Sequence, residues 1–408
     1  WDPASGPYLV QGNLLINPGV TLTIEPDTTV FLQSGAMITV NGGINASGSD
    51  GHPIRFLPWS CDAWDRIELD HATGPATFAY CDFRESMAGG RYNTARIGLL
   101  TIIGTDATID HCSFRDITRG VELNTGSTLI YTNNQMINTK EAFHSNNCYA
   151  SLRNSTWENQ IGYADAVDFD GSSVPMSEVV NCVFNGGGDD CIDTDRTDML
   201  IEGNIIMGFD SEDGKGVSFQ GDSHPIMRNN LIFNCTNGIA IKDSCDPTLD
   251  HNTFVNNQRG IHSYEKNAGA GPGLGTMTNS ILWGNDESLS LEDGSTLAVT
   301  YSDIDQTTAG TGNINANPLF INPAKGDFHL RPGSPAIDAG ENGVTMGVYD
   351  AEGLLFAPDF SGLQITELMY HPIAGDQYEY IELHNAGDQW LDMSGLAFTA
   401  GVSFVFPA

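Results

Sequence analysis

The stretch Gly186-Gly-Gly-Asp-Asp-Cys-Ile-Asp-Thr-Asp195 is one copy of a pattern that recurs along the chain. In each copy a small residue precedes positions that alternate between core-facing and outward-facing, which predicts a β-strand with one buried face. Ile192 should then face a core, and Asp193 should face outward. The copies start at Gly120, Ala142, Ala166, Cys191, Gly216, Gly238, Gly260 and Ser288.

A second marker repeats with the same period: an apolar residue, then three places later Asn, Cys or Ser, then another apolar residue. Its copies are mostly about 21 to 28 residues apart, and units of this length must stack to bury a core. The sequence therefore predicts an all-β fold, a right-handed parallel β-helix of roughly a dozen turns. We expect the Asn amides of this column to bond the turns above and below. The column contains Cys81, Cys112, Asn134, Ser155, Cys182, Asn204, Asn230, Asn252, Ser280 and Ser302.

The composition excludes some classes of protein. Asp and Glu total 52 against 17 Lys and Arg, and the formal net charge of -35 argues against a nucleic-acid partner, since binding phosphates requires positive charge. No apolar run is long enough for a membrane span. So acidic a surface suits a saline or calcium-rich exterior, and a chain that begins at Trp1 is expected to be a mature or trimmed product. We therefore expect an extracellular or cell-surface protein.

The eight cysteines do not form an obvious disulfide framework. Those in the repeated column, at 81, 112 and 182, are expected to act as small buried apolar residues. The rest remain plausible disulfide partners, and the sequence leaves their pairing open. They are Cys61, Cys148, Cys191, Cys235 and Cys245.

The pattern also predicts the domain boundaries. The β-helix should occupy residues 1–340, with capping turns at 1–58 and a closing segment at 313–340, followed by a linker at 341–362. The phrase Thr21-Leu-Thr-Ile-Glu-Pro26 resembles the opening turns of bacterial secreted β-helix proteins, and residues 317–340 resemble the closing segment common to bacterial extracellular ones. The Gly-rich loop from Lys266 to Gly273 should form a wall beside the outward face.

Residues 363–408 resemble a different module. Leu363 to Pro372, Glu379 to Asn385 and Leu391 to Gly395 look like the first strands of a lamin-tail domain, which implies an immunoglobulin-like sandwich. Such a sandwich needs about 100 residues. The chain should therefore contain only part of that domain.

The outward face gathers an unusual number of carboxylates. Two successive turns place three Asp residues each on one small patch, where like charges about 5 Å apart repel. Oxygen-rich clusters of this kind are what Ca²⁺ requires, so we expect a calcium site; the alternative is that the carboxylates are solvated or bond to adjacent turns. The candidate ligands are Asp165, Asp168, Asp189, Asp190, Asp193 and Asp195.

This patch resembles two enzyme families. Asp189 to Asp193, with Asp165 one turn earlier, is similar to the calcium-binding pattern of β-helical pectate lyases of the family-nine type, in which a lysine removes the proton; Ser218 stands at the position of that lysine. The stretch Gly188-Asp-Asp-Cys-Ile192 also resembles the paired-Asp motif of polygalacturonases.

The polygalacturonase likeness would make Asp165 a third catalytic carboxylate. The sequence departs from that family, because Lys215 replaces its histidine and Ala240 its arginine. The closest overall likeness, over about residues 174–270, is to bacterial surface β-helix proteins with lamin-tail modules, and it implies the fold more than an activity. It includes Gly214-Lys-Gly216, Lys242-Asp243 and Tyr264-Glu-Lys266.

A lyase needs a cation to neutralise the uronate carboxylate and a base to take the neighbouring proton. Lys215 and Lys242 lie one and two turns beyond the carboxylates, so they and Asp190 are the catalytic candidates; the alternative is that the lysines are only counter-ions. Residues of the same face that should bind sugar are His144, Arg259, His262 and Tyr264.

The sequence thus predicts a calcium-binding β-helix that engages an acidic polysaccharide and cleaves it by β-elimination. Two alternatives stay open. One is a non-catalytic wall or matrix protein in which the calcium site is structural. The other is a glycoside hydrolase that uses Asp165, Asp189 and Asp190 as acid and base.

Overall fold

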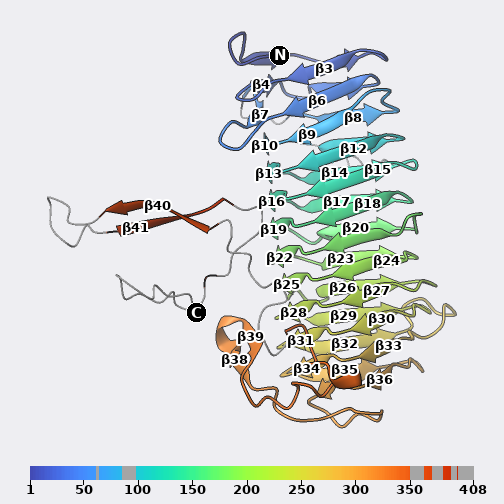
Figure 1. The fold of residues 1–408 in the computed structure, drawn as a ribbon. Coiled ribbons are helices and arrows are strands. Elements are labelled where there is room, and N and C mark those ends of the chain that lie inside the picture. The colour runs from blue at the N-terminus through green and yellow to red at the C-terminus, as the bar shows by residue number, and fades with distance from the viewer. Residues whose placement is uncertain (61–63, 85–97, 350–362, 370–379, 387–392, 394–408) are drawn as a thin grey trace.

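The computed structural model describes residues 1–60, 64–84, 98–349, 363–369, 380–386 and 393. Most of them form a long right-handed parallel β-helix, in which three parallel sheets of 13, 12 and 12 strands run along the rod (Figure 1). Each strand pairs with the strand three places later in the chain, so one turn contributes one strand to each sheet. The predicted fold class and the predicted number of turns are confirmed.

The three sheets are named A, B and C. Sheet A contains β1 (Tyr8–Val10), β4 (Thr29–Leu32), β7 (Ile54–Pro58), β10 (Cys81–Arg84), β13 (Ser113–Arg115), β16 (Gln135–Ile137), β19 (Thr156–Glu158), β22 (Val183–Asn185), β25 (Ile205–Met207), β28 (Leu231–Phe233), β31 (Thr253–Val255), β34 (Ile281–Trp283) and β37 (Asp303–Ile304). Sheet B contains β2 (Leu14–Ile16), β5 (Met37–Val40), β8 (Arg66–Asp70), β11 (Leu100–Ile103), β14 (Arg119–Asn124), β17 (Glu141–Asn146), β20 (Val167–Asp170), β23 (Asp190–Asp195), β26 (Lys215–Gln220), β29 (Asn237–Lys242), β32 (Arg259–Tyr264) and β35 (Glu287–Leu291). Sheet C contains β3 (Thr21–Ile24), β6 (Gly43–Ser47), β9 (Ala76–Ala79), β12 (Asp106–Asp110), β15 (Thr128–Thr132), β18 (Tyr149–Arg153), β21 (Ser177–Val180), β24 (Met199–Glu202), β27 (Ile226–Arg228), β30 (Thr248–Asp250), β33 (Thr276–Thr278) and β36 (Ala298–Thr300).

The pairing register of sheet B is the one that the repeats predict. Ile192 pairs with Val167 on one side and with Val217 on the other, and all three side chains are buried in the core. Asp193 pairs with Asp168 and faces outward. A slip of one residue would have exchanged the two faces. The polar residues of successive turns therefore stack on one side of sheet B.

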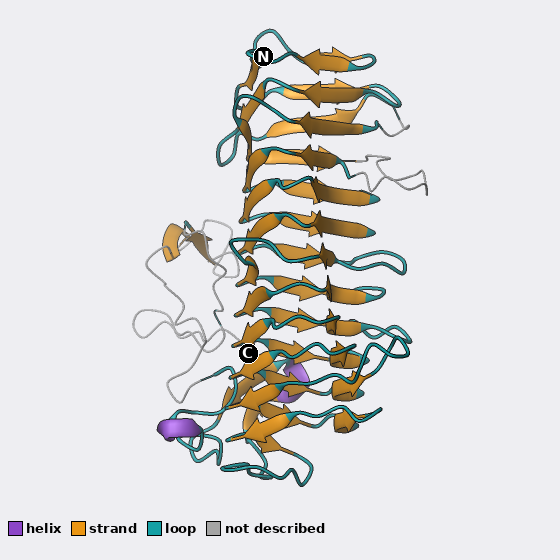
Figure 2. Cartoon of the chain, turned by 90° about the vertical axis from the view of Figure 1, so that its right-hand side faces the viewer, coloured by secondary structure: helices purple, strands orange, loops and turns teal. Residues whose placement is uncertain are grey.

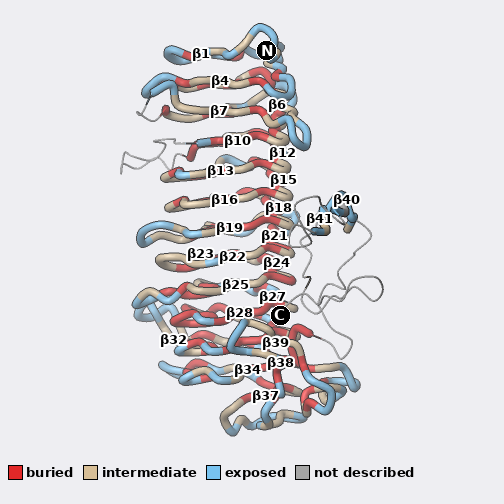
Figure 3. Tube along the Cα trace, turned by 90° about the vertical axis from the view of Figure 1, so that its left-hand side faces the viewer, coloured by how far each residue is buried: buried red, intermediate tan, exposed pale blue. Residues whose placement is uncertain are grey.

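The core is continuous along the rod, because equivalent residues of successive turns pack on one another (Figure 3). In sheet A, Phe83 stacks on both Phe56 and Phe114 with ring centroids 4.9 Å apart. Further along, Trp157 stacks on Phe184 at 4.5 Å. The strands are connected by short turns and a few longer loops (Figure 2).

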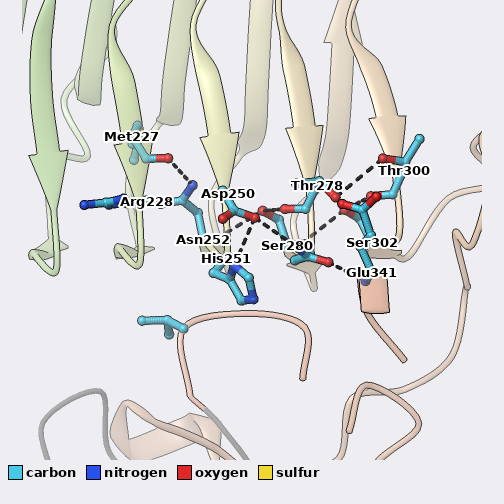
Figure 4. Close-up of polar contacts among 12 residues, drawn as sticks. Met227, Arg228, Asp250, His251, Asn252, Thr278, Ser280, Thr300, Ser302 and Glu341 are labelled. Carbon is cyan, nitrogen blue, oxygen red and sulfur yellow. Dashed lines mark hydrogen bonds and ion pairs between the residues drawn. The ribbon is translucent and has the colours of Figure 1, made fainter. Parts of the chain in front are cut away.

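The repeated Asn column forms a ladder of buried amides, as predicted. The Nδ2 of Asn204 donates to Oδ1 of Asn230 at 2.9 Å, and the Nδ2 of Asn230 donates to Oδ1 of Asn252 at 3.0 Å. The ladder continues through Ser280 and Ser302, whose hydroxyls accept from the backbone of the preceding turn (Figure 4). A second ladder, from Cys235 through Asn257 to Asn285, was not predicted.

Removing one amide of the ladder should destabilise the rod. Asn230 is fully buried and bonds to both neighbouring turns, so Asn230→Ala strands several polar groups in the core. We expect the free energy of unfolding to fall by on the order of 3 kcal/mol, measured by urea denaturation. The exposed Asn185 is the matched control, and Asn185→Ala should change stability little. Equal losses for the two variants would contradict a structural ladder.

The cysteines outside the column are not disulfide-bonded in the described part of the chain. Cys148, Cys191, Cys235 and Cys245 are buried free thiols, as are the three in the column. They occupy small inward positions of other turns; Cys245, for example, lies 3.4 Å from the Ser223 hydroxyl. The suggestion that these four form bridges is wrong, and Cys61 lies outside the described residues.

The end of the chain's β-helix differs from the prediction. After β37, residues 313–349 fold back along the outer face of sheet A and contain β38 (Phe320–Asn322), η1 (Pro323–Lys325), β39 (Asp327–Leu330) and η2 (Glu341–Gly343). This segment lies beside the rod near β31 and β34 (Figure 1), and its apolar side chains pack on outward-facing residues of β28, β31 and β34. The side chains that pack together include Phe320, Phe328, Leu330, Met346 and Val348 with Leu231, Phe233, Val255 and Ile281.

Two backbone contacts attach the last part of this segment to the rod. The amide of Val348 donates to the Thr253 hydroxyl at 3.0 Å, and the amide of Glu341 donates to Asn279 Oδ1 at 2.7 Å. The predicted linker at 341–362 therefore begins too early, because residues up to 349 pack on the rod. The apolar residues of 344–349 are spaced to fit the outer face of sheet A and do not follow the repeat. The repeat therefore could not predict that this segment packs on the rod.

The predicted lamin-tail region contains one described antiparallel pair, β40 (Leu363–Met369) and β41 (Tyr380–Asn385). The third predicted strand, at 391–395, lies outside the described residues apart from Met393. Within the described part of the chain, no helix has the length and apolar character needed to cross a membrane.

Candidate active site on the outer face of sheet B

The outer face of sheet B brings the predicted polar residues together in columns. Asp168 pairs with Asp193, and Asp193 pairs with Ser218. Three residues earlier in the same two strands, Asp190 pairs with Lys215. These residues follow core-facing positions of β20, β23 and β26, and the in-register stacking of the strands fixes their place.

The six predicted carboxylates do not form one cluster; most of them divide into two groups. In the first, one oxygen of each of Asp165, Asp189 and Asp190 lies within 4.8 Å of the others. In the second, Asp168 and Asp170 lie beside His144. Asp193 belongs to neither group, and Asp195 pairs with the exposed Arg196 at 3.3 Å. The structure thus divides five of the predicted ligands between two groups, and metal binding by them stays a prediction.

The first group, named the Asp165 cluster (Asp165, Asp189 and Asp190), carries more negative charge than its surroundings favour. Burial and the charges of Asp193 and Asp190 raise the pKa of Asp165 to about 8. Burial also raises the pKa of Asp190 to about 6, although Lys215 opposes the shift. The amide of Asp190 donates to Asp165 Oδ1 at 3.2 Å and links the two turns.

The donor set of the Asp165 cluster fits calcium. Ca²⁺ takes oxygen ligands and tolerates irregular geometry, and all three side chains supply carboxylate oxygens close to one another. The raised pKa values of Asp165 and Asp190 indicate that Lys215 does not fully offset the burial and mutual repulsion of these carboxylates. The cluster is therefore a candidate cation site.

Lys215 forms ion pairs with two carboxylates. Its Nζ lies 3.0 Å from Asp190 Oδ1 and 3.1 Å from Asp213 Oδ2. Although burial lowers the pKa of Lys215, these two carboxylates raise it well above its usual value. These ion pairs favour the protonated form of Lys215, which suits a counter-ion, and a catalytic role for Lys215 stays a prediction.

Lys242 has the opposite electrostatic environment. Only 2% of the residue is exposed, and its Nζ donates to Ser218 Oγ at 2.6 Å. Burial lowers the pKa of Lys242, against the opposing charges of Asp193 and Asp190. The side chain reaches back one turn, so its amine lies beside Ser218, which the sequence places where the pectate lyases have their lysine.

Aromatic side chains lie further along the same face. The rings of His262 and Tyr264 stack with centroids 4.3 Å apart, and His262 Nε2 lies 3.2 Å from Glu292 Oε1. Burial is the main reason that the pKa of Tyr264 rises to about 12. Arg259 Nε lies 3.6 Å from Glu287 Oε2 and keeps part of its surface exposed.

The predicted wall is held in place by Asp243. Its Oδ1 accepts the backbone amides of Lys266 at 2.8 Å and Asn267 at 2.9 Å. Beside this loop is a polar groove of about 450 Å³. Its lining includes Asp195, Arg196, Gln220, Asp222, Asp243 and Asn267.

His144 is enclosed by carboxylates of neighbouring turns. It is 1% exposed and lies between Glu122 of the preceding turn and Asp170 of the following turn. Its two ring nitrogens face these side chains, and substrate binding by His144 stays a prediction. The sequence did not single out Tyr163, which is 61% exposed and bonds to Asp189. The sequence feature that could have identified Tyr163 is its place in a turn, next to Gly162 and two residues before Asp165.

Fold and site together define a right-handed parallel β-helix with an acidic, lysine-containing face. The family described as "Right handed beta helix region" matches residues 98–267 and, in overlap, 142–309, and the chain belongs to this family. No curated protein matches the chain.

Similar solved structures have low sequence identity. Pectate lyase Pel9A is 17% identical, with 82% of this chain and 88% of that chain covered and a TM-score of 0.38. The periplasmic alginate epimerase AlgG is 12% identical, with 72% and 79% covered and a TM-score of 0.40. The catalytic domain of a GH87 α-1,3-glucanase is 14% identical, with 74% and 63% covered and a TM-score of 0.39.

Proposed function

We propose that the outer face of sheet B binds an acidic polysaccharide and cleaves it by β-elimination, with Lys242 as the base. The observation that carries this proposal is the buried Lys242 amine. Its pKa is lowered, and its hydrogen-bond partner is a neutral hydroxyl. No carboxylate within the described residues forms an ion pair with it, in contrast to Lys215. An amine that loses its proton readily is what abstraction of a carbon-bound proton requires.

In the proposed reaction Lys242 takes the proton next to the uronate carboxylate. The electron pair left on carbon forms a double bond, and the bond to the leaving sugar oxygen breaks; this oxygen takes the bonding pair and accepts a proton from water. Calcium bound by Asp165, Asp189 and Asp190 would supply positive charge to the substrate carboxylate. Lys215 holds Asp190 in position through their ion pair. Tyr264 and His262 offer a stacked aromatic surface for a sugar ring.

Incubation of the protein with several uronate polymers tests the reaction type. We expect an unsaturated product that absorbs in the ultraviolet. New reducing ends without that absorbance would instead support the hydrolase. An oxygen of each carboxylate in the Asp165 cluster lies within 4.8 Å of the others, closer than the roughly 6.5–9.5 Å that separates the carboxyl groups of an inverting hydrolase. If neither product forms, the result would support the non-catalytic matrix protein.

We also propose that the protein acts outside the cell and that β40 and β41 begin a lamin-tail domain. The net charge of -35 supports an exterior location, because a surface so acidic tolerates saline and calcium-rich media. Fractionation of the source cells, with an antibody against the rod, checks the location; finding the protein only in the cytosol would contradict it.

A further inference from the structure

A second cluster, named the His144 cluster (Glu122, His144, Asp168 and Asp170), lies on the neighbouring turns of sheet B. β14 supplies Glu122, β17 supplies His144, and β20 supplies both Asp residues. Glu122 and His144 are almost completely buried, whereas the Asp side chains are partly exposed. The register Glu122–His144–Asp168 is fixed by strand pairing, so the imidazole lies between carboxylates of two other turns.

The two nitrogens of His144 have different surroundings. Nδ1 lies 2.7 Å from Glu122 Oε1, which is a short, strong hydrogen bond. Nε2 lies 3.4 Å from Asp170 Oδ2 and 3.7 Å from Asp168 Oδ2. Charge-assisted bonds between nitrogen and carboxylate measure about 2.7–2.9 Å. The Asp170 contact is a long hydrogen bond, and the Asp168 oxygen lies beyond hydrogen-bond distance of this buried nitrogen.

The longer distances suit ligands that share a metal ion. Zinc binds nitrogen and carboxylate oxygen at about 2.0–2.2 Å, so two ligands at tetrahedral or somewhat wider angles lie roughly 3.3–3.8 Å apart. The distances from Nε2 to both Asp oxygens are within this range. One nitrogen and two oxygens can approach a common ion.

We propose that His144 Nε2, Asp168 and Asp170 bind a divalent transition-metal ion, with Zn²⁺ as the reference case. Glu122 accepts the Nδ1 proton and thereby directs the Nε2 lone pair at the ion, which is the usual arrangement around a metal-bound histidine. The imidazole nitrogen distinguishes this site from the Asp165 cluster, since Ca²⁺ and Mg²⁺ prefer oxygen ligands. The ion joins β17 to β20, and this site does not depend on the proposed polysaccharide chemistry.

Cobalt binding to the full chain tests the site. After chelator treatment and dialysis, Co²⁺ should produce a visible absorption spectrum that saturates at one ion per chain. Zn²⁺ should abolish this spectrum, and excess Ca²⁺ should not. His144→Asn should remove it, and Glu122→Gln should weaken binding by about 10- to 100-fold because only the orienting partner changes.

His71 is the matched control, because it forms an exposed pair with Asp70 at 2.7 Å. His71→Asn should leave the cobalt spectrum unchanged, and so should Asp190→Asn, which alters the Asp165 cluster alone. A spectrum that survives His144→Asn would overturn the proposal. If that variant does not fold, nitrogen NMR of the wild-type histidines decides: the His144 Nε2 signal must shift on addition of Zn²⁺, and its failure to shift would also overturn the proposal.

Discussion

Replacing Lys242 with Met is expected to lower the rate of uronate-polymer cleavage by about 10²- to 10⁴-fold, the usual contribution of a general base. Methionine keeps the apolar stem that is packed beside Ser218 and removes only the amine. Binding should change little, so the loss should appear in kcat rather than in KM. Burial lowers the pKa of Lys242, so the wild-type rate should rise with pH and level off below the ordinary lysine value of about 10.4.

Three further variants make this result specific. Lys242→Arg should be as inactive as Lys242→Met, because a guanidinium does not lose its proton at ordinary pH. Lys325, exposed in η1 and remote from sheet B, is the control, and Lys325→Met should retain full activity. Lys215→Met should lose activity because it disturbs Asp190. It should also move the midpoint of the pH profile to higher pH, because the Lys215 charge helps to lower the pKa of Lys242. An active Lys242→Met enzyme would falsify the assignment of the base.

In the presence of a chelator, the free energy of unfolding should fall as the pH rises from about 4 to about 8. Asp165 and Asp190 have folded pKa values of about 8 and about 6, above the value of about 3.9 for an unfolded Asp. The folded protein therefore binds more protons than the unfolded chain over this window, and it loses stability as they leave. The slope is at most about 1.4 kcal/mol per pH unit for each group.

Calcium should reverse this loss. An ion that binds only the folded rod stabilises it by about 2.7 kcal/mol at a hundredfold excess over its dissociation constant, which thermal melting at pH 8 would measure. Asp190→Ala should remove most of the calcium response, and Asp190→Asn, which keeps an oxygen ligand but loses the charge, should remove less of it. Equal melting temperatures with calcium and with chelator, in protein shown to be metal-free, would rule out the site.

The control for these Asp variants must be an exposed residue. Asp303 lies outside the cluster in the sequence, but it is fully buried, and burial raises its pKa to about 7. Asp303→Ala would therefore disturb the end of the rod, where Asp303 Oδ1 accepts the Ala316 amide. Asp286 is exposed, and Asp286→Ala should leave the calcium response unchanged.

The sequence predicted the fold, the register and the amide ladder, because each depends on a short period that every turn repeats. Asp168 and Asp193 could be aligned from their places in the alternation alone. The alternation could not predict the direction of a long side chain. Lys215 bends to Asp190 on the preceding turn, whereas Lys242 bends to Ser218, and these contacts give the two lysines opposite pKa shifts.

Other features depended on contacts between distant residues. The burial of His144 follows from Glu122 on the turn before it and Asp170 on the turn after it, and a column of outward positions does not show such enclosure. The return of the closing segment depends on contacts such as Val348 with Thr253, 95 residues apart. No repeated spacing encodes a contact of that kind.

The returning segment also limits how the number of turns can vary during evolution. Its apolar residues fit the outer faces of β28, β31 and β34 together, and its backbone bonds to Thr253 and Asn279 on successive turns. Duplication or deletion of a turn between β28 and β34 would shift these partners by one strand spacing, about 4.8 Å, and break the fit. Ile205 and Met207 of β25 also pack against this cluster, whereas the described turns before β25 contribute no residue to it, so the rod can lengthen or shorten there while its end stays the same.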